Sequence, residues 1–299
     1  MEDNVAKDII LRNMREARDS LERRDRMYDA HIKEIAYLLV DEACRDGIDD
    51  LGSLCDRMRE QYLEFLSLAS PDGMDKDFGV RFCAWASDEL VKRKAVRDSL
   101  PYFGELFGRE RVRVSRLPNR LADEAYERFA ERIENLTPSI ADNIVDVCEE
   151  VADSRSELCM LPVYASADGL MHTVCRHVIK NGLFPVMFCD VPTDDEFFVR
   201  FALFSPSMCM TKNADTAVVT VIGSDPADVF LLPHAISAYG GRSVDIISLA
   251  SSLYEGSRAW QIIFSVDGAD MLRIYVFLAM HFPRFEINGI CEIIKEEEF

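Results

Sequence analysis

The order of strand and helix patterns in the last third of the chain, from about residue 214, constrains the fold most. Four apolar, β-rich runs and two helical patterns follow one another there. Asp225-Pro226 predicts the start of the first helix, because Asp accepts hydrogen bonds from the free N–H groups of a first turn and Pro fits that turn. Gly240-Gly241 predicts its end. The expected strands are 217–222, 244–249, 259–266 and 285–294, and the expected helices are 225–239 and 270–281. This order predicts a βαββαβ domain over residues 213–299.

The remaining two thirds divide into parts of different character. Residues 4–45, 50–69 and 75–99 carry apolar side chains at steps of three and four, which predicts three helices and an all-α unit at 1–104. Residues 105–212 alternate short apolar strands with amphipathic helices, two of them expected at 120–135 and 139–152, which predicts an α/β layer. The whole chain is therefore expected to have an α+β fold in three domains.

Composition limits the classes of partner. The chain has 299 residues, of which 48% are hydrophobic, so a packed core is expected. Its 34 basic and 53 acidic residues give a formal net charge of −19. Because phosphate binding needs a basic face, neither nucleic acid nor a membrane is expected as a partner. A small anionic ligand in one local basic pocket stays possible.

The cysteines and the start of the chain predict a cytoplasmic protein. The nine cysteines form no CxxC pair, which favours reduced, buried thiols. Residues 1–8 are polar and acidic, unlike a signal peptide, and no apolar run is long enough for a membrane span. Cys159, His172, Cys175 and His177 do not complete a tetrahedral ligand set, so neither a metal nor a cofactor is expected.

Three short stretches resemble motifs of one enzyme family. They are DRMREQYL at 56–63, LPVYASADG at 161–169 and FVRF at 198–201. Together with the order of the three parts, they resemble the bifunctional chorismate mutase–prephenate dehydratase proteins of phenylalanine biosynthesis. Those chains carry a three-helix mutase, a dehydratase domain and an ACT domain that senses phenylalanine. The resemblance implies that residues 213–299 are a ferredoxin-like domain of the ACT type.

In the mutase-like part, the resemblance implies a site built from Arg15, Asp56, Arg59 and Glu60. Chorismate is a dianion, and its rearrangement develops charge at the ether oxygen, so the reaction needs several Arg and Lys donors in a dry pocket. The family takes a second Arg and a Lys from the first helix, where this chain has Ile32 and Ala43. Mutase activity is therefore expected to be vestigial or lost.

In the dehydratase-like part, Ser166 and Arg200 match the family's motifs. Tyr164 replaces an acidic residue of the motif, and Val199 replaces a Thr whose hydroxyl belongs to the site. Val cannot donate a proton. The stretch between Ser166 and Val199 is also too short to hold the family's second lobe. We therefore expect a shortened lobe without dehydratase activity.

In the ACT-like part, the positions that resemble the family's ligand site lie at the start of the first helix and after the second strand. They are Asp225, Pro226, Ala227, Asp228, Val229 and Ser248. ACT domains bind an amino acid between paired domains and hold its carboxylate on helix-start amides. The implied partners are a small carboxylate (an aromatic amino acid, chorismate or prephenate) and a second copy of the chain. Asp225 and Asp228 would repel a carboxylate, so a phenylalanine sensor of the usual kind is not expected, while a changed ligand, or pairing alone, stays open.

Three functions stay open. The first is a sensor or association module that has lost dehydratase activity. The second is an active chorismate mutase in which Arg12, Arg26 or Lys33 supplies the missing charges around Arg15 and Arg59. The third is a scaffold without a small ligand.

Overall fold

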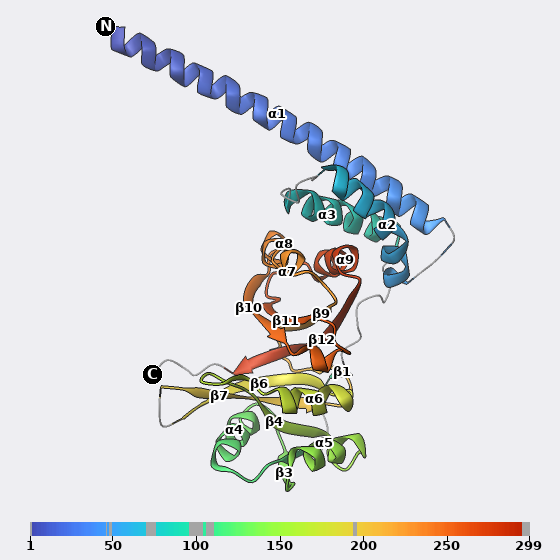
Figure 1. Ribbon diagram of the computed structural model, residues 1–299, viewed down its shortest axis with the longest axis vertical. Coiled ribbons are helices and arrows are strands. Elements are labelled where there is room, and N and C mark those ends of the chain that lie inside the picture. The colour runs from blue at the N-terminus through green and yellow to red at the C-terminus, as the bar shows by residue number, and fades with distance from the viewer. Residues whose placement is uncertain are drawn as a thin grey trace. The chain divides into compact units, whose positions relative to one another are not determined.

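The protein is described by a computed structural model of residues 1–299 (Figure 1). The structure describes residues 2–45, 47, 50–69, 76–95, 104–105, 111–193 and 196–294, without the side chains of 2–13, 15, 17, 69, 76, 104–105 and 243–244. Contacts divide the chain into a helical unit, Met1–Ser99 with Leu272–His281, and a mixed unit, Leu100–Met271 with Phe282–Phe299. The expected domain boundaries at residues 104 and 212 stay predictions.

The helical unit consists of α1 (Glu2–Cys44), α2 (Leu51–Ala69), α3 (Lys76–Lys92) and α9 (Met271–His281). The three expected N-terminal helices are present. In α1, the buried side chains among those described fall between Ile32 and Ala43. Met14 and Leu21 are exposed, and the first turns of α1 extend past α2 and α3 (Figure 1). Of the α1 side chains that the structure describes, those in the last part of this long helix therefore contribute to the core.

Aromatic rings from α2, α3 and α9 pack together in the helical unit. The rings of Tyr62 and Phe82 are 4.7 Å apart, and those of Phe277 and His281 are 3.9 Å apart. The Tyr62 hydroxyl lies 2.6 Å from Nε2 of His281. Burial, and to a smaller extent the charge of Arg59, lowers the pKa of His281 from 6.5 to about 3. The imidazole is therefore neutral, and one of its nitrogens can accept a hydrogen bond.

The first part of the mixed unit, residues 112–205, is called the lobe here. Its sheet has the order β3-β2-β4-β7-β6, in which β2 is parallel to β3 and β4, and β7 is antiparallel to β4 and β6. One face packs against α4, and the other packs against α5 and α6. The bounds are β2 (Val112–Arg116), α4 (Arg120–Ala130), β3 (Leu136–Ile140), α5 (Ile144–Ala152), β4 (Leu158–Ala165), β5 (Gly169–Leu170), α6 (His172–Lys180), β6 (Phe184–Pro192) and β7 (Phe198–Ser205). Outside this sheet, β1 (Gly104–Glu105) pairs with β8 (Cys209–Met210).

The helix expected at 139–152 is wrong in its first part. Residues 136–140 form strand β3, and α5 begins only after Asn143, whose side chain accepts a hydrogen bond from the backbone of Asp146. Pro138 lies within β3, which among the strands that the structure describes pairs with β2 alone. Proline is tolerated in such an edge strand because no neighbour needs its missing N–H. The expected helix 120–135 likewise ends earlier, at Ala130.

The C-terminal sheet is formed by β9 (Thr216–Ile222), β10 (Arg242–Leu249), β11 (Ala259–Ser265) and β12 (Arg284–Ile294). Its order is β10-β11-β9-β12, with every pair antiparallel, which is the order of a ferredoxin-like sheet. The predicted strands and the α+β class are confirmed. The single helix expected at 225–239 is wrong, because it is divided into α7 (Pro226–Val229) and α8 (Leu232–Ala238), with Pro233 in the first turn of α8. Proline has no N–H with which to continue the preceding turn.

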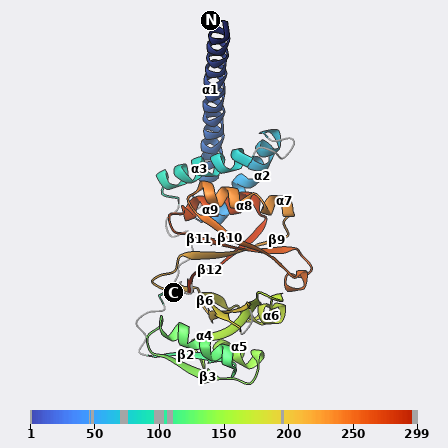
Figure 2. The same ribbon diagram turned by 90° about the vertical axis from the view of Figure 1, so that its left-hand side faces the viewer.

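The lobe and the C-terminal sheet are joined within the mixed unit (Figures 1 and 2). Strand β12 pairs in parallel with β6, with Glu292 opposite Met187. One core cluster includes Val218 and Ile263 from the C-terminal sheet together with Phe204 from the lobe. A side chain at Gly289 would lie 2.7 Å from the carbonyl oxygen of Pro185, so the junction needs glycine there.

Candidate functional site

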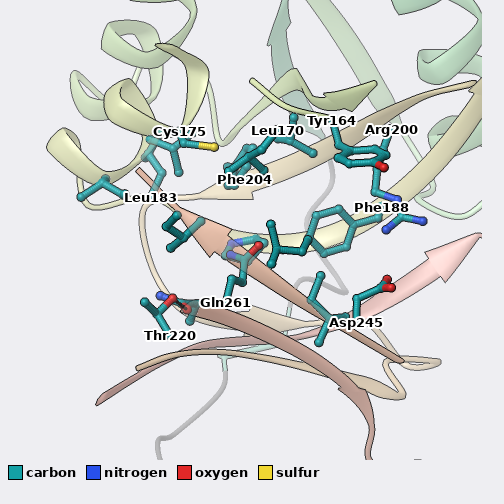
Figure 3. A pocket seen from close by; sticks show the side chains of 18 of the residues that line it. Tyr164, Leu170, Cys175, Leu183, Phe188, Arg200, Phe204, Thr220, Asp245 and Gln261 are labelled. Carbon is teal, nitrogen blue, oxygen red and sulfur yellow. Dashed lines mark hydrogen bonds between the residues drawn. The ribbon is translucent and has the colours of Figure 1, made fainter. Parts of the chain in front are cut away.

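A cavity of about 400 Å³ lies in the mixed unit between the lobe and the C-terminal sheet (Figure 3). The lobe contributes residues of β4, β6, β7 and α6, and the C-terminal sheet contributes residues of all four strands. Most of the lining side chains are apolar. The volume is within the usual range of small-molecule sites, about 300–1,000 Å³.

Strand alternation aims these side chains into the cavity. In β10 and β11, Asp245 lies opposite Ile263 and Ile247 lies opposite Gln261. In β9, Thr220 lies opposite Gln261. Residues two apart in a strand point to the same face, and paired residues share that face, so all five point toward the lobe.

The charged end of the cavity is built around Arg200. Its Nε and Nη2 donate to the two carboxylate oxygens of Asp190, at 2.7 and 2.8 Å. These hydrogen bonds are the largest cause of a raised pKa of Arg200, and the charges of Asp190 and Asp245 act in the same direction against burial. The guanidinium lies 5.9 Å from the ring of Phe198. Arg200 is therefore a fixed cation that is already paired.

The opposite end is polar and uncharged. Oγ1 of Thr220 donates to Oδ1 of Asn288 at 2.7 Å. Burial raises the pKa of Tyr254, although a hydrogen bond with Thr220 acts in the opposite direction, so the phenol stays protonated. The Gln261 amide makes no hydrogen bond among the described residues and points into the cavity in Figure 3. An amide offers both a donor and an acceptor to a ligand.

Apolar side chains separate the two ends. They include Leu170, Leu183, Phe188 and Phe204, all visible in Figure 3. Cys175 also lines the cavity, and burial raises its pKa to about 11. Its thiol is therefore protonated at neutral pH and is not an activated nucleophile.

The two dehydratase-like stretches lie side by side in the sheet. Strands β4 and β7 pair, with Tyr164 opposite Arg200. Arg200 lines the cavity, whereas Ser166 does not. Oγ of Ser166 instead accepts a hydrogen bond from the backbone N–H of Phe198 at 2.8 Å. The structure thus gives Ser166 a local role in holding the start of β7.

The six ACT-like positions lie outside the cavity lining. Asp225 caps α7 and accepts a hydrogen bond from the N–H of Ala227 at 2.9 Å, with Pro226 in the first turn and Val229 buried. Burial, and then the charge of Asp225, raises the pKa of Asp228. Ser248 is exposed on β10. The helix start carries two carboxylates, and one of its amides is already occupied.

The mutase-like residues are only partly described. Arg15 lies in α1, and its side chain is outside the described residues. Asp56 and Glu60 are exposed on α2. Arg59 is half-buried, and its Nε has no hydrogen-bond partner within the described ranges of the chain. Burial lowers the pKa of Arg59, with the charge of Asp56 acting in the opposite direction.

A smaller pocket, of about 180 Å³, lies between α1 and α2. Among the described residues its lining includes one basic side chain, that of Arg57, and one acidic side chain, that of Glu42. Nε2 of Gln61 donates to Glu42 across it, at 3.3 Å. Arg59 and the two exposed carboxylates of the motif do not line this pocket. The convergence of three cations that a mutase requires is not seen among the described side chains.

The sequence reading missed Thr220, Asp245, Gln261 and Asn288. A signal was present, since Thr220 and Gln261 are polar residues at inward positions of strands that otherwise bury apolar side chains. Strand alternation identifies such positions. It does not identify which other part of the chain covers that face.

Among the described residues, no group of His, Cys, Asp and Glu could hold a metal ion. No family model and no curated protein matches the sequence. None of the described helices is long and apolar enough to cross a membrane. A prephenate dehydratase from Streptococcus mutans has a TM-score of 0.49 and 13% identity, covering 62% of this chain and 100% of that chain. A quorum-quenching acylase has a TM-score of 0.47 and 15% identity, over 60% of this chain and 94% of its own. A prephenate dehydratase from Staphylococcus aureus has a TM-score of 0.47 and 12% identity, over 60% of this chain and 99% of its own. Values this low assign neither a family nor an activity to this chain.

Proposed function

We propose that the chain is a sensor that binds one small organic molecule in the cavity of the mixed unit. The observation that carries this proposal is that residues of both the lobe and the C-terminal sheet line the cavity. A molecule bound there contacts both parts at once. Binding therefore favours the arrangement in which they are joined, and the chain gains stability by mass action.

The chemistry of the dehydratase-like stretches supports sensing over dehydration. Val199, at the position of a hydroxyl in the motif, has no proton to transfer. The Ser166 hydroxyl is engaged with the backbone of β7. Arg200 is paired with Asp190 through two hydrogen bonds. Of the motif residues that the structure describes, neither Ser166 nor Arg200 is therefore free to act as the acid or base that the removal of water and carbon dioxide requires.

Ligand screening by thermal shift and calorimetry tests the proposal. The panel contains the aromatic amino acids, the amines and acids that share their ring systems, chorismate and prephenate. A bound ligand raises the melting temperature of the full chain. A Leu170→Trp chain, whose added ring occupies the cavity, loses this response. Val145→Trp on α5 is the control, because Val145 is exposed and does not line the cavity.

Two outcomes contradict the proposal. If no member of the panel shifts the melting temperature, the scaffold reading is favoured. If purified protein consumes prephenate well above background, the chain is an enzyme and the reasoning from Val199 fails. The expected pairing of two copies stays a prediction, which light scattering tests separately.

A chorismate mutase in the helical unit is the second candidate, and one observation favours it. The Nε of Arg59 is buried without a hydrogen-bond partner among the described residues. Such a group costs about 1–3 kcal/mol, and a bound carboxylate would satisfy it. Chorismate turnover that Arg59→Gln abolishes, and that exposed Arg113→Gln leaves unchanged, would establish this candidate.

A further inference from the structure

Arg200 and Asp245 are the charged side chains that line the cavity among the described residues, and they lie at the same end (Figure 3). Arg200 uses Nε and Nη2 to bind Asp190. Asp245 is exposed at the cavity edge and makes no hydrogen bond or ion pair among the described residues. Behind Asp190, Arg128 donates to the backbone carbonyl of Asp190 at 2.6 Å and is itself paired with Glu124 at 3.0 Å, so this end and the groups behind it combine two positive charges with three negative charges.

The excess of negative charge at this end of the cavity favours a positively charged ligand over a negatively charged one. A carboxylate that approached Arg200 would also approach Asp190 and Asp245, whereas an ammonium group would be attracted to Asp245. Two aromatic rings stand at the same end, with the centroids of Tyr164 and Phe198 6.0 Å apart. Aromatic faces attract cations and tolerate the alkyl part of an amine.

The sheet register gives the distance to the polar end. Asp245 lies opposite Ile263, and Gln261 is two residues from Ile263 in the same strand. Two residues along a strand span about 6.7 Å and neighbouring strands are about 4.8 Å apart, so the Cα atoms of Asp245 and Gln261 are about 8 Å apart. Between these ends, Ile247, Ile263 and Phe188 offer apolar contact.

We infer that the cavity binds an aromatic amine, with its ammonium group at Asp245, its ring among the apolar side chains and a ring hydroxyl at Gln261. An arylethylamine with a para-hydroxyl group carries its nitrogen and oxygen at opposite ends of an apolar body, which matches this arrangement. This inference rests on the proposed function, because it specifies the ligand class of the same cavity.

Four probes that share one ring test the head group. They are tyramine (amine), tyrosine (zwitterion), para-hydroxyphenylpropionate (acid) and para-ethylphenol (neutral), each titrated calorimetrically into the full chain. Tyramine binds tightest, para-ethylphenol and tyrosine follow, and the acid binds weakest. Added salt weakens tyramine binding and leaves para-ethylphenol unchanged, because an exposed charge pair is screened.

Two variants locate the ends of the ligand. Asp245→Asn keeps the shape of the side chain and removes its charge, so the Kd for tyramine rises about tenfold while that for para-ethylphenol stays the same. Asp267→Asn is the matched control, because Asp267 is also exposed and does not line the cavity. Gln261→Leu removes the preference for tyramine over phenethylamine, which lacks the hydroxyl group.

The outcomes separate this inference from the proposed function. Binding of the acid or the neutral probe at least as tightly as tyramine, lost in Leu170→Trp, overturns the inference and leaves the cavity a ligand site. Tyramine binding that Asp245→Asn does not weaken also overturns it. If none of the four probes binds, the inference fails. If, in addition, no compound of the wider thermal-shift panel changes the melting temperature, the sensor proposal fails as well.

Discussion

Replacing Gly79 by Ala tests the packing of the helical unit. An added Cβ would lie 2.6 Å from Nε2 of His281 and 2.8 Å from the hydroxyl of Tyr62. Those two atoms are themselves hydrogen-bonded at 2.6 Å. The methyl group therefore forces apart α2, α3 or α9, or breaks this hydrogen bond.

Three effects decide the sign of the change. Ala is favoured over Gly inside a helix by about 0.8–1 kcal/mol. Overpacking a filled core costs about 1–3 kcal/mol, and losing the hydrogen bond costs about 0.5–1.5 kcal/mol. The steric effects outweigh propensity, and we expect Gly79→Ala to lower the free energy of unfolding by about 2 kcal/mol.

The two tryptophans allow the units to be followed separately. Trp85 lies in α3, and Trp260 lies in β11. The indole N–H of Trp260 has no hydrogen-bond partner among the described residues, so Trp260→Phe removes no polar contact and leaves Trp85 as the reporter of the helical unit. Urea unfolding of this background, with and without Gly79→Ala, gives the difference in free energy.

Gly52→Ala in α2 is the matched control. Its Cβ would meet Asp50 at 3.4 Å and Tyr275 at 3.6 Å, which are ordinary contacts. Because Ala is also favoured over Gly in a helix, we expect Gly52→Ala to leave the free energy of unfolding unchanged or to raise it by up to about 1 kcal/mol. Tyr62→Phe removes one of the clashing atoms, so its effect combined with Gly79→Ala should be less than the sum of the two. If Gly79→Ala is as stable as the parent, the steric reasoning is refuted.

Three further predictions follow from single interactions. The pKa of His281 falls from 6.5 to about 3 on folding, so the imidazole binds a proton more readily when unfolded. Its contribution is complete well above pH 6.5 and is lost as the pH falls toward 3. From neutral pH to pH 5 the loss is about 2 kcal/mol, which is measured by urea unfolding followed by Trp85 and is absent in His281→Gln. Arg200→Lys loses the paired hydrogen bonds to Asp190 and destabilises the mixed unit by about 1–2 kcal/mol, measured by Trp260 fluorescence; an unchanged midpoint would contradict this. Asp225→Ala removes the cap of α7 and costs about 1 kcal/mol, whereas Asp225→Asn, which also caps, keeps most of the stability.

The sequence predicts those helices and strands whose ends are marked by turn and capping residues and whose apolar residues recur at a regular period. The strands of the C-terminal sheet follow from β-rich apolar runs before and after the helical segment that Asp225-Pro226 and Gly240-Gly241 delimit, and their order in the sheet agrees with the βαββαβ pattern. Strand β3 was missed because Pro138 near an apolar run resembles a helix start. Only the pairing with β2 at the sheet edge reveals its actual conformation.

The cavity depends on contacts that no local pattern contains. Arg200 was singled out by its motif, but its pairing with Asp190 and its proximity to Asp245 arise from tertiary structure. Asp245 by itself is an ordinary exposed residue of a strand. The grouping of Leu272–His281 with the N-terminal helices is also tertiary, since its sequence predicts only an apolar helix.

The position of β12 has a consequence for the biosynthesis of the protein. This strand follows every other strand of the sheet in the sequence, yet it lies between β9 and β6. Until the ribosome has released residue 294, both neighbours expose unpaired edges, and open edges recruit other strands. The nascent chain therefore holds two separate half-sheets that only the last strand can join. Early release or a nick before β12 should yield aggregation rather than a smaller folded protein.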